Sequence, residues 1–168
     1  MESILPSLIA LAVLLMGAAT TYASTHRTVD QVATTWKAMM VQAEERAGTR
    51  LDLREVTVDE TGTEIEVRLL NAGNTKIDAF DRMDVILEYT DVGNQKRVAW
   101  FSYRTSNPGT GEWTVSVIAP DTFDPRILNP GEELTMLLIV NPPVGTGPIH
   151  RVTIATPNGV PLSTTFAR

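Results

Sequence analysis

The sequence predicts an α+β protein, in which a long N-terminal helix precedes an all-β antiparallel sandwich. Three observations lead to this prediction. Residues 4–23 are apolar and carry no charge, residues 24–47 follow an amphipathic helical pattern, and from residue 49 onward apolar and polar residues alternate with period two. We therefore expect two domains, a helix at 1–48 and a β-sandwich at 49–168.

The first half of the expected helix is apolar on every side. The run from Ile4 to Tyr22 would be roughly 28 Å long as a helix, which is close to the hydrocarbon thickness of a bilayer. A secretory signal peptide would have Lys or Arg before its apolar core and a small-residue cleavage site after it. No Lys or Arg precedes this run, and no clear cleavage site follows it. We expect the segment to be retained in the working protein.

The second half of the helix is amphipathic. Apolar residues recur there at steps of three and four, and a glycine, Gly48, gives the stop signal. The apolar set is Val29, Val32, Trp36, Met39 and Met40. We expect these side chains to pack where the helix meets a β-sandwich domain, either that of the same chain or that of a neighbour.

Period-two alternation predicts about eight strands in the remainder of the chain. The expected strands are 51–58, 63–71, 83–91, 96–104, 112–120, 133–141, 149–157 and 161–167. Short joints rich in Asn, Pro and Gly separate them, which is typical of an antiparallel sandwich or barrel. One of these joints, at residues 107–113, is expected to be a hairpin tip.

Composition and motifs argue against catalysis and nucleic-acid binding. The net charge is −6 with no basic cluster, and there is no cysteine. The two histidines, His26 and His150, are expected to be exposed or capping. Asp78, Asp81 and Asp84 lack the glycine and terminal glutamate of a calcium loop. We expect no enzyme activity, catalytic residue, metal, cofactor or small-molecule substrate.

Four segments carry a resemblance to a known family. They are "VRLLNAGNTKID" (67–78), "MDVILEY" (83–89), "ILNPGEELTMLLIV" (127–140) and "VTIATPNGVPLSTTF" (152–166). In this order behind such a helix, they resemble the archaellins, the archaeal flagellins of type IV pilin-like filaments, and their flagellin-like accessory proteins. The resemblance implies an archaellin-like, immunoglobulin-like sandwich.

The resemblance also implies a function. It implies an extracellular filament for motility, with membrane insertion of the helix before assembly and an ATP-driven assembly machinery as partner. The filament core would hold the apolar helices of many copies. The residues expected there are Ile4, Leu5, Leu8, Ile9, Leu11, Ala12, Leu14, Leu15 and Met16.

The N-terminus departs from the family pattern in two ways. Family precursors carry a basic leader ending in Lys/Arg-Gly, and its absence here leads us to expect the processed form. Bacterial pilins carry a glutamate at the fifth mature position, whereas this chain has Leu5 there and its acid is Glu2. Glu2 is expected either to pair with a neighbour's terminal amine or to be a solvated first-turn acid. No Asn-x-Ser/Thr glycan acceptor occurs.

Two alternative functions remain at this point. In one, the chain is a membrane-anchored stator or accessory protein of the archaellum motor; in the other, it is an adhesive type IV-like pilin. An anchor would usually carry Lys or Arg on its cytoplasmic flank, and the first 25 residues contain neither. This neutrality favours the filament, because a charge near its axis would be desolvated.

Overall fold

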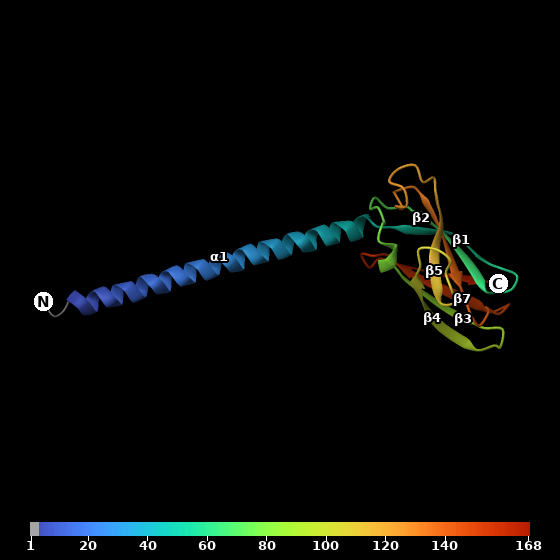
Figure 1. Ribbon diagram of the computed structural model, residues 1–168, viewed down its shortest axis with the longest axis horizontal. Helices are drawn as coiled ribbons and strands as arrows, with labels where there is room; N and C mark the ends of the chain where they lie inside the picture. Colours follow the sequence, from blue (N-terminus) through green and yellow to red (C-terminus); the bar gives the residue numbers. More distant parts are fainter. Residues whose placement is uncertain (1–3) are drawn as a thin grey trace. The chain divides into compact units, whose positions relative to one another are not determined.

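The computed structural model describes the backbone of residues 4–168 and the side chains of residues 7–22 and 30–168. The chain divides into two compact units, one ending at Ala43 and the other spanning Glu44–Arg168. An α-helix, α1 (Ile4–Gly48), forms the first unit and contributes its last turn to the second (Figure 1). We call the second unit the head. The helix ends at Gly48, as the sequence predicts.

The head contains the eight predicted strands. They are β1 (Leu51–Val58), β2 (Glu64–Asn71), β3 (Asp84–Thr90), β4 (Lys96–Tyr103), β5 (Glu112–Ala119), β6 (Glu133–Ile139), β7 (Ile149–Ala155) and β8 (Pro161–Ala167), and a short 3-10 helix, η1 (Phe80–Arg82), precedes β3. Their ends agree with the prediction to within about two residues. The α+β fold class is confirmed.

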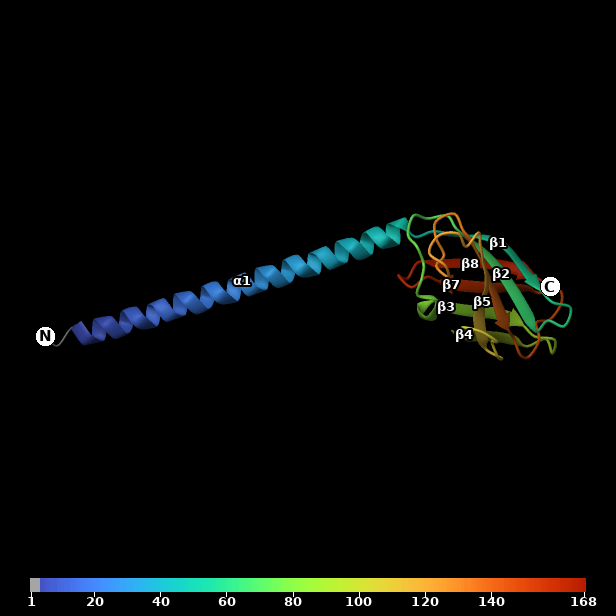
Figure 2. The same cartoon turned by 45° about the horizontal axis from the view of Figure 1, so that its top comes forward.

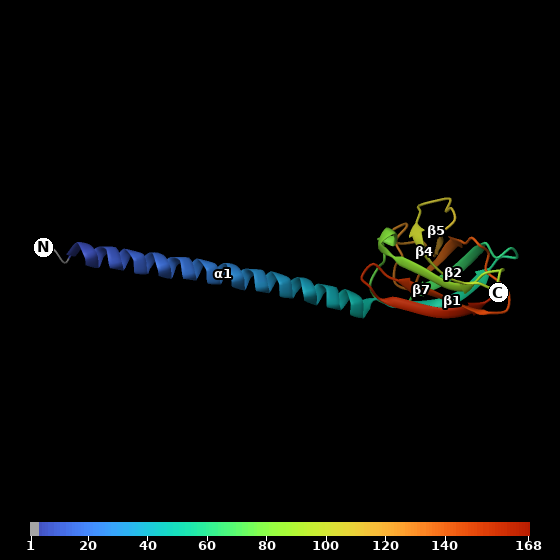
Figure 3. The same cartoon turned by 90° about the horizontal axis from the view of Figure 1, so that it is seen from below.

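The strands form two layers of a sandwich. Their order is β1-β2-β6-β5-β4-β3-β7-β8, and the first four and last four strands make one layer each. Figure 2 shows β3, β7 and β8 side by side, with β2 and β5 crossing them at an angle. The two ends of the series, β1 and β8, contact each other, so the series almost closes on itself (Figure 3).

A single hydrophobic core lies between the layers. Alternate residues of β2 and β6 enter it from one side, and alternate residues of β3 and β7 from the other. Trp113 is its largest fully buried side chain. The Tyr103 ring lies 4.9 Å from the Trp113 ring and 6.4 Å from the Phe80 ring, centroid to centroid. Burial of these rings contributes strongly to the stability of the head.

One strand pair departs from the predicted antiparallel arrangement. β4 and β5 pair in parallel over two residues, where Ser102 N–H donates to Gly111 O at 3.1 Å and Arg104 N–H donates to Trp113 O at 2.8 Å. The predicted hairpin tip at 107–113 is therefore wrong. The segment instead carries the chain from one layer to the other, because β4 pairs along its length with β3 and β5 pairs with β6.

Two strands with a free edge carry a bulge. β5 is paired with β4 only through Glu112 and Trp113, so the rest of β5 has no strand partner on that side among the described residues. The register of β5 against β6 shifts between Val115 and Val117, and that of β1 against β2 shifts between Leu53 and Glu55. Bulges twist a strand and interrupt the regular row of backbone groups.

His150 is buried in the head, contrary to the expectation that it is exposed or capping. It is 1% exposed, and its ring lies 5.4 Å from the Phe166 ring. Thr90 N–H donates to His150 Nδ1 at 3.2 Å, so the other ring nitrogen, Nε2, carries the proton and donates to Gly145 O at 3.0 Å. The imidazole therefore joins β3, β7 and the loop before β7.

Replacing His150 should destabilise the head. In His150→Leu the side chain keeps a similar volume, but Thr90 N–H and Gly145 C=O lose their partners, at about 1–3 kcal/mol for each unsatisfied group. Urea denaturation of the full chain, followed by near-UV circular dichroism, measures the loss. Arg151→Ala, at an exposed position of the same strand, is the control and should change stability by about 0.5 kcal/mol or less. Equal stability of both variants would contradict this role of His150.

Two aspartates organise turns of the head. Asp59 accepts hydrogen bonds from the Thr61 hydroxyl, Thr61 N–H and Glu64 N–H, and the Thr61 hydroxyl contributes most to a strongly lowered pKa of this carboxyl. Asp91 accepts from Gln95 N–H at 2.9 Å and from Arg97 Nε at 2.9 Å. The bond from Gln95 is the main cause of the lowered pKa of Asp91, and Arg97 adds to it.

These two carboxylates should make the head less stable in acid. Each has a lower pKa in the folded than in the unfolded chain, so near pH 4 the unfolded state binds more protons. Their contribution is present at neutral pH and is lost as the pH falls through and below about 4. The urea midpoint should fall between pH 7 and pH 3, and it should fall less in Asp59→Asn. A pH-independent midpoint in the wild-type chain would contradict the assignment.

Candidate functional site

The apolar half of α1 presents large aliphatic side chains that are mostly exposed. Their exposed fractions are 58% for Leu8, 60% for Ile9, 55% for Leu11, 65% for Val13, 71% for Leu14, 62% for Leu15 and 71% for Met16. Successive residues of an α-helix point about 100° apart, so the four consecutive residues 13–16 cover every side of the helix. A helix that covers only its own domain needs a single apolar stripe.

Most of the predicted core residues belong to this set. Ala12 is exposed as well, and Val13 joins the set although the prediction omitted it. The side chains of Ile4 and Leu5 lie outside those that the structure describes, and Glu2, with its expected charge pairing, lies outside the described residues. The role of all these residues in a filament core stays a prediction.

The amphipathic half of α1 also carries exposed apolar side chains. Val32, Trp36, Met39 and Met40 are between 50% and 68% exposed, whereas the side chain of Val29 is outside those described. Their expected packing against a β-sandwich domain stays a prediction. Three of the four are large, flexible or aromatic side chains of the kind that protein interfaces favour.

Within the described residues, no helical stretch combines the length and the apolarity needed to cross a membrane. The membrane-spanning segment expected at 4–22 is therefore not confirmed.

The last turn of α1 is held by two loops of the head, at residues 71–76 and 156–160. We call this attachment the clamp. Helices end with carbonyl groups that have no partner within the helix. In the clamp, Gly48 O accepts from Asn74 N–H at 2.7 Å and from Thr75 N–H at 3.3 Å, and Glu45 O accepts from the Thr75 hydroxyl at 3.2 Å. The first loop thus satisfies the helix end.

The second loop of the clamp binds the same turn through Asn158. Asn158 Nδ2 donates to the Thr49 hydroxyl at 2.6 Å and to Glu45 O at 3.3 Å. In return, Arg46 Nε donates to Asn158 O at 2.6 Å. The side chain of Asn158 is itself oriented by the Thr156 hydroxyl, which donates to Asn158 Oδ1 at 2.6 Å. Three hydrogen bonds therefore join one asparagine to the helix end and the residue after it, and a fourth orients its side chain.

Asn71 orders the first loop from inside the head. It is fully buried, and its Nδ2 donates to Thr75 O at 2.9 Å and to Leu128 O at 3.1 Å. Its Oδ1 accepts from Gly73 N–H at 3.1 Å. Position 73 requires glycine because the loop lies very close to the end of the helix there. A Cβ atom at this position would lie 2.5 Å from Arg50 N and would also clash with Gly48 O. The loop can reach the helix only with glycine at this position.

The clamp is not predictable as a site from the sequence, although both of its loops lie in segments that the sequence analysis names. The loops are the "NAGNTK" and "TPNG" parts of the segments that carry the family resemblance. They were interpreted as turns, which they are, but asparagine side chains that bond to a distant helix end leave no signal in local pattern. A repeated Asn-x-Gly or Asn-Gly turn behind a long helix is the only available hint.

Among the described residues, no three His, Asp or Glu side chains gather as a metal site would require.

The sequence model of the archaeal-type flagellin family matches residues 6–166, which is nearly the whole chain. The chain belongs to the archaeal-type flagellin family. It is therefore an archaellum-related protein, and the components of the archaellum are structural proteins of the cell surface or the membrane. Among curated proteins, no sequence matches it significantly.

Solved structures with the same fold come from two parts of the archaellum. The archaeal flagellum of Methanospirillum hungatei superposes over 99% of this chain and 93% of its own, with a TM-score of 0.64 and 12% identity. The archaellum periplasmic stator protein FlaG from Sulfolobus acidocaldarius covers 70% of this archaeal-type flagellin and 99% of its own chain, with a TM-score of 0.52 and 23% identity. The archaellum periplasmic stator complex of FlaF and FlaG from the same organism covers 70% of this chain and 89% of its own, with a TM-score of 0.52 and 21% identity.

A larger side chain at position 73 should weaken the clamp. Gly73→Ala would force the loop away from Gly48 O and Arg50 N, and overpacking of this kind costs about 1–3 kcal/mol. Hydrogen exchange at the amides of residues 72–75 should accelerate, and the urea midpoint should fall. Gly109→Ala is the matched control, since a Cβ atom there meets only Glu112 Oε2, at 3.4 Å. Unchanged exchange in Gly73→Ala would contradict the role of the clamp.

Proposed function

We propose that this archaeal-type flagellin is the structural subunit of an extracellular, archaellum-type filament that serves motility. Copies assemble by packing the apolar halves of their N-terminal helices together in the core of the filament. The observation that carries the proposal is the all-round exposure of large aliphatic side chains on residues 8–16 of α1. Such a surface fits an environment that is apolar in every direction, which a bundle of identical helices provides.

The energetics support assembly as the place where these side chains are buried. Burying seven large aliphatic side chains at roughly 1.5–3 kcal/mol each gives about 10–20 kcal/mol gross per subunit relative to water. Before assembly, the same residues would lie in the cytoplasmic membrane, so the net gain from lipid would be much smaller. Extraction from the membrane would therefore need an assembly machinery as a further partner.

The clamp supports a mechanical role for the head. A filament that turns must pass force from its core to its surface through each subunit. Hydrogen bonds from two separate loops to the last turn of α1 resist both bending and rotation of that turn against the sandwich. A flexible linker at this position would absorb such force.

A stator or accessory protein of the archaellum motor is the second candidate. Its support is the likeness of the sandwich to the FlaG stator protein over 70% of the chain. In that case the apolar helix would stay in the membrane, and purified native protein would form no fibres. An adhesive pilin would form fibres by the same helix packing and differ in what the head contacts.

A charge in the apolar half of α1 should abolish the filament. Leu11→Asp would bury an unpaired carboxylate among neighbouring helices, at a cost of several kcal/mol per subunit. Negative-stain microscopy should show uniform fibres for the wild-type protein and none for the variant, whereas circular dichroism should show a folded head in both.

Two controls make this test specific. Leu11→Met keeps the position apolar and should assemble normally. Gln31→Asp adds the same charge in the amphipathic half of α1, where the side chain is exposed, and should also assemble. Normal fibres from Leu11→Asp would refute core packing, and wild-type protein without fibres would favour the stator.

A further inference from the structure

The loop between β5 and β6 presents a phenylalanine to solvent. Phe123 is 75% exposed, so its ring is available for contact with another molecule. The loop is nevertheless ordered by its own hydrogen bonds. Asn129 Nδ2 donates to Phe123 O at 2.7 Å, and the Asp121 carboxylate accepts from Arg126 N–H at 3.2 Å. We call this preorganised projection, residues 121–126, the knob.

The outer face of the β4-β3-β7-β8 layer contains a shallow pocket of about 230 Å³, a volume that one aromatic side chain can occupy. We call it the outer pocket. Two exposed apolar side chains border it, Val98 at 76% and Ile149 at 75%. Cations line it as well: Lys96, Arg97 and Arg151.

The outer pocket offers cations to an aromatic ring. Glu88 and Asp91 offset two of the three cations of the pocket, at 3.7 Å from Arg151 and 2.9 Å from Arg97. Lys96 has no ion pair within the described residues and leaves the pocket with a positive excess. The knob itself carries two aspartates and Arg126, and Asp124 lies 3.8 Å from Lys76, so the knob brings the Phe123 ring rather than a net charge to the contact. The face of an aromatic ring attracts ammonium and guanidinium groups.

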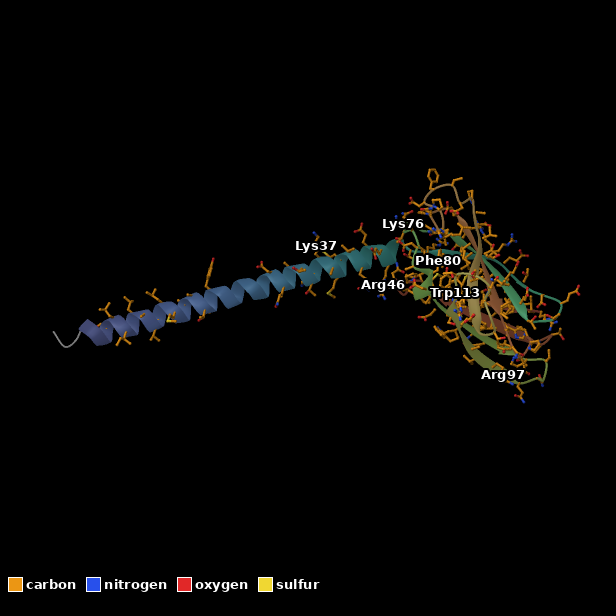
Figure 4. All side chains as sticks on the ribbon, in the orientation of Figure 1. Lys37, Arg46, Lys76, Phe80, Arg97 and Trp113 are labelled. Atoms are coloured by element: carbon orange, nitrogen blue, oxygen red, sulfur yellow. The ribbon has the colours of Figure 1, made fainter. Side chains whose placement is uncertain are left out.

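The knob and the outer pocket lie at opposite ends of the head. The knob loop continues into Leu128, which bridges to Ile77 next to the clamp. β3 starts at that end with Asp84, and its last three residues, 88–90, line the outer pocket, roughly 13–20 Å further along the strand. Figure 4 shows the same separation, with Lys76 at one end of the head and Arg97 at the other. The two surfaces therefore cannot meet within one head.

We propose that the knob of one copy inserts Phe123 into the outer pocket of the next copy. Because the contact joins two different surfaces, it is heterologous, and in a helical filament it would repeat from copy to copy without closing into a ring. It would link successive heads along a filament, in addition to the helix packing in the core. This inference rests on the proposed function, since it assumes that copies of the chain assemble.

The absence of native cysteine allows a direct cross-linking test on the full chain. In the double variant Thr122→Cys with Val98→Cys, which keeps the Phe123 ring, oxidation of assembled protein should give a ladder of covalent multimers on denaturing gels. Each single variant should give no cross-link, and a mixture of the two single variants should give dimers only. The control pair replaces Val98→Cys with Glu66→Cys, at an exposed position of β2 in the other layer, and should give no ladder.

The outcomes separate this inference from the proposed function. Fibres without a ladder would overturn the knob contact and leave the filament standing. Dimers from either single variant would overturn it too, because they require a two-fold contact between like surfaces. Failure of the wild-type protein to form fibres, with no ladder from the double variant, would overturn both.

A second measurement tests the energy of the contact. Phe123→Ser should raise the protein concentration needed for fibre formation roughly tenfold, as expected for a buried aromatic residue at the centre of an interface. Val92→Ser removes another exposed apolar side chain of the head, at 62%, which lines neither the knob nor the outer pocket, and should leave that concentration unchanged. Equal behaviour of the two variants would contradict the role of Phe123.

Discussion

The end of α1 is the point on which the rest of the structure depends. A helix that stops against a β-sandwich leaves its last carbonyl groups without partners, and burying them unpaired would be costly. In this protein two loops from distant parts of the sequence supply the donors, and Thr75 of one loop and Asn158 of the other both donate to Glu45 O. The turn that joins helix and sandwich is thereby part of the head, and its geometry is set by hydrogen bonds rather than by a linker.

The sequence predicted the elements of the fold well, because each has a strong local signal. The helix and all eight strands follow from apolar periodicity, and Gly48 marks the helix end. Relations between distant segments could not be obtained this way. The parallel contact of β4 with β5 depends on which layer each strand joins, and the burial of His150 depends on two backbone groups, at Thr90 and Gly145. Neither has a signature in adjacent residues.

The candidate site, too, has one part that the sequence predicts and another that it does not. The apolar residues of α1 were predictable, since uniform apolarity is visible in the sequence itself. The clamp was not, although its residues lie in the segments that resemble the family, because the partners of Asn158 are about a hundred residues away in the chain. The knob could not be predicted for another reason. A single phenylalanine in a polar loop has no distinctive sequence pattern, and only the structure shows that its side chain is exposed.

The head stabilises itself through its own core, which frees the apolar surface of α1 for contacts with other molecules. A protein that reaches high local concentration must also avoid unwanted association. Its free strand edges are the main hazard, because an unpaired edge is a template for adding any other strand. The bulges in β1 and β5 lie in strands that have such edges. By breaking the regular spacing of N–H and C=O groups there, they discourage amyloid-like stacking of one head on the edge of another.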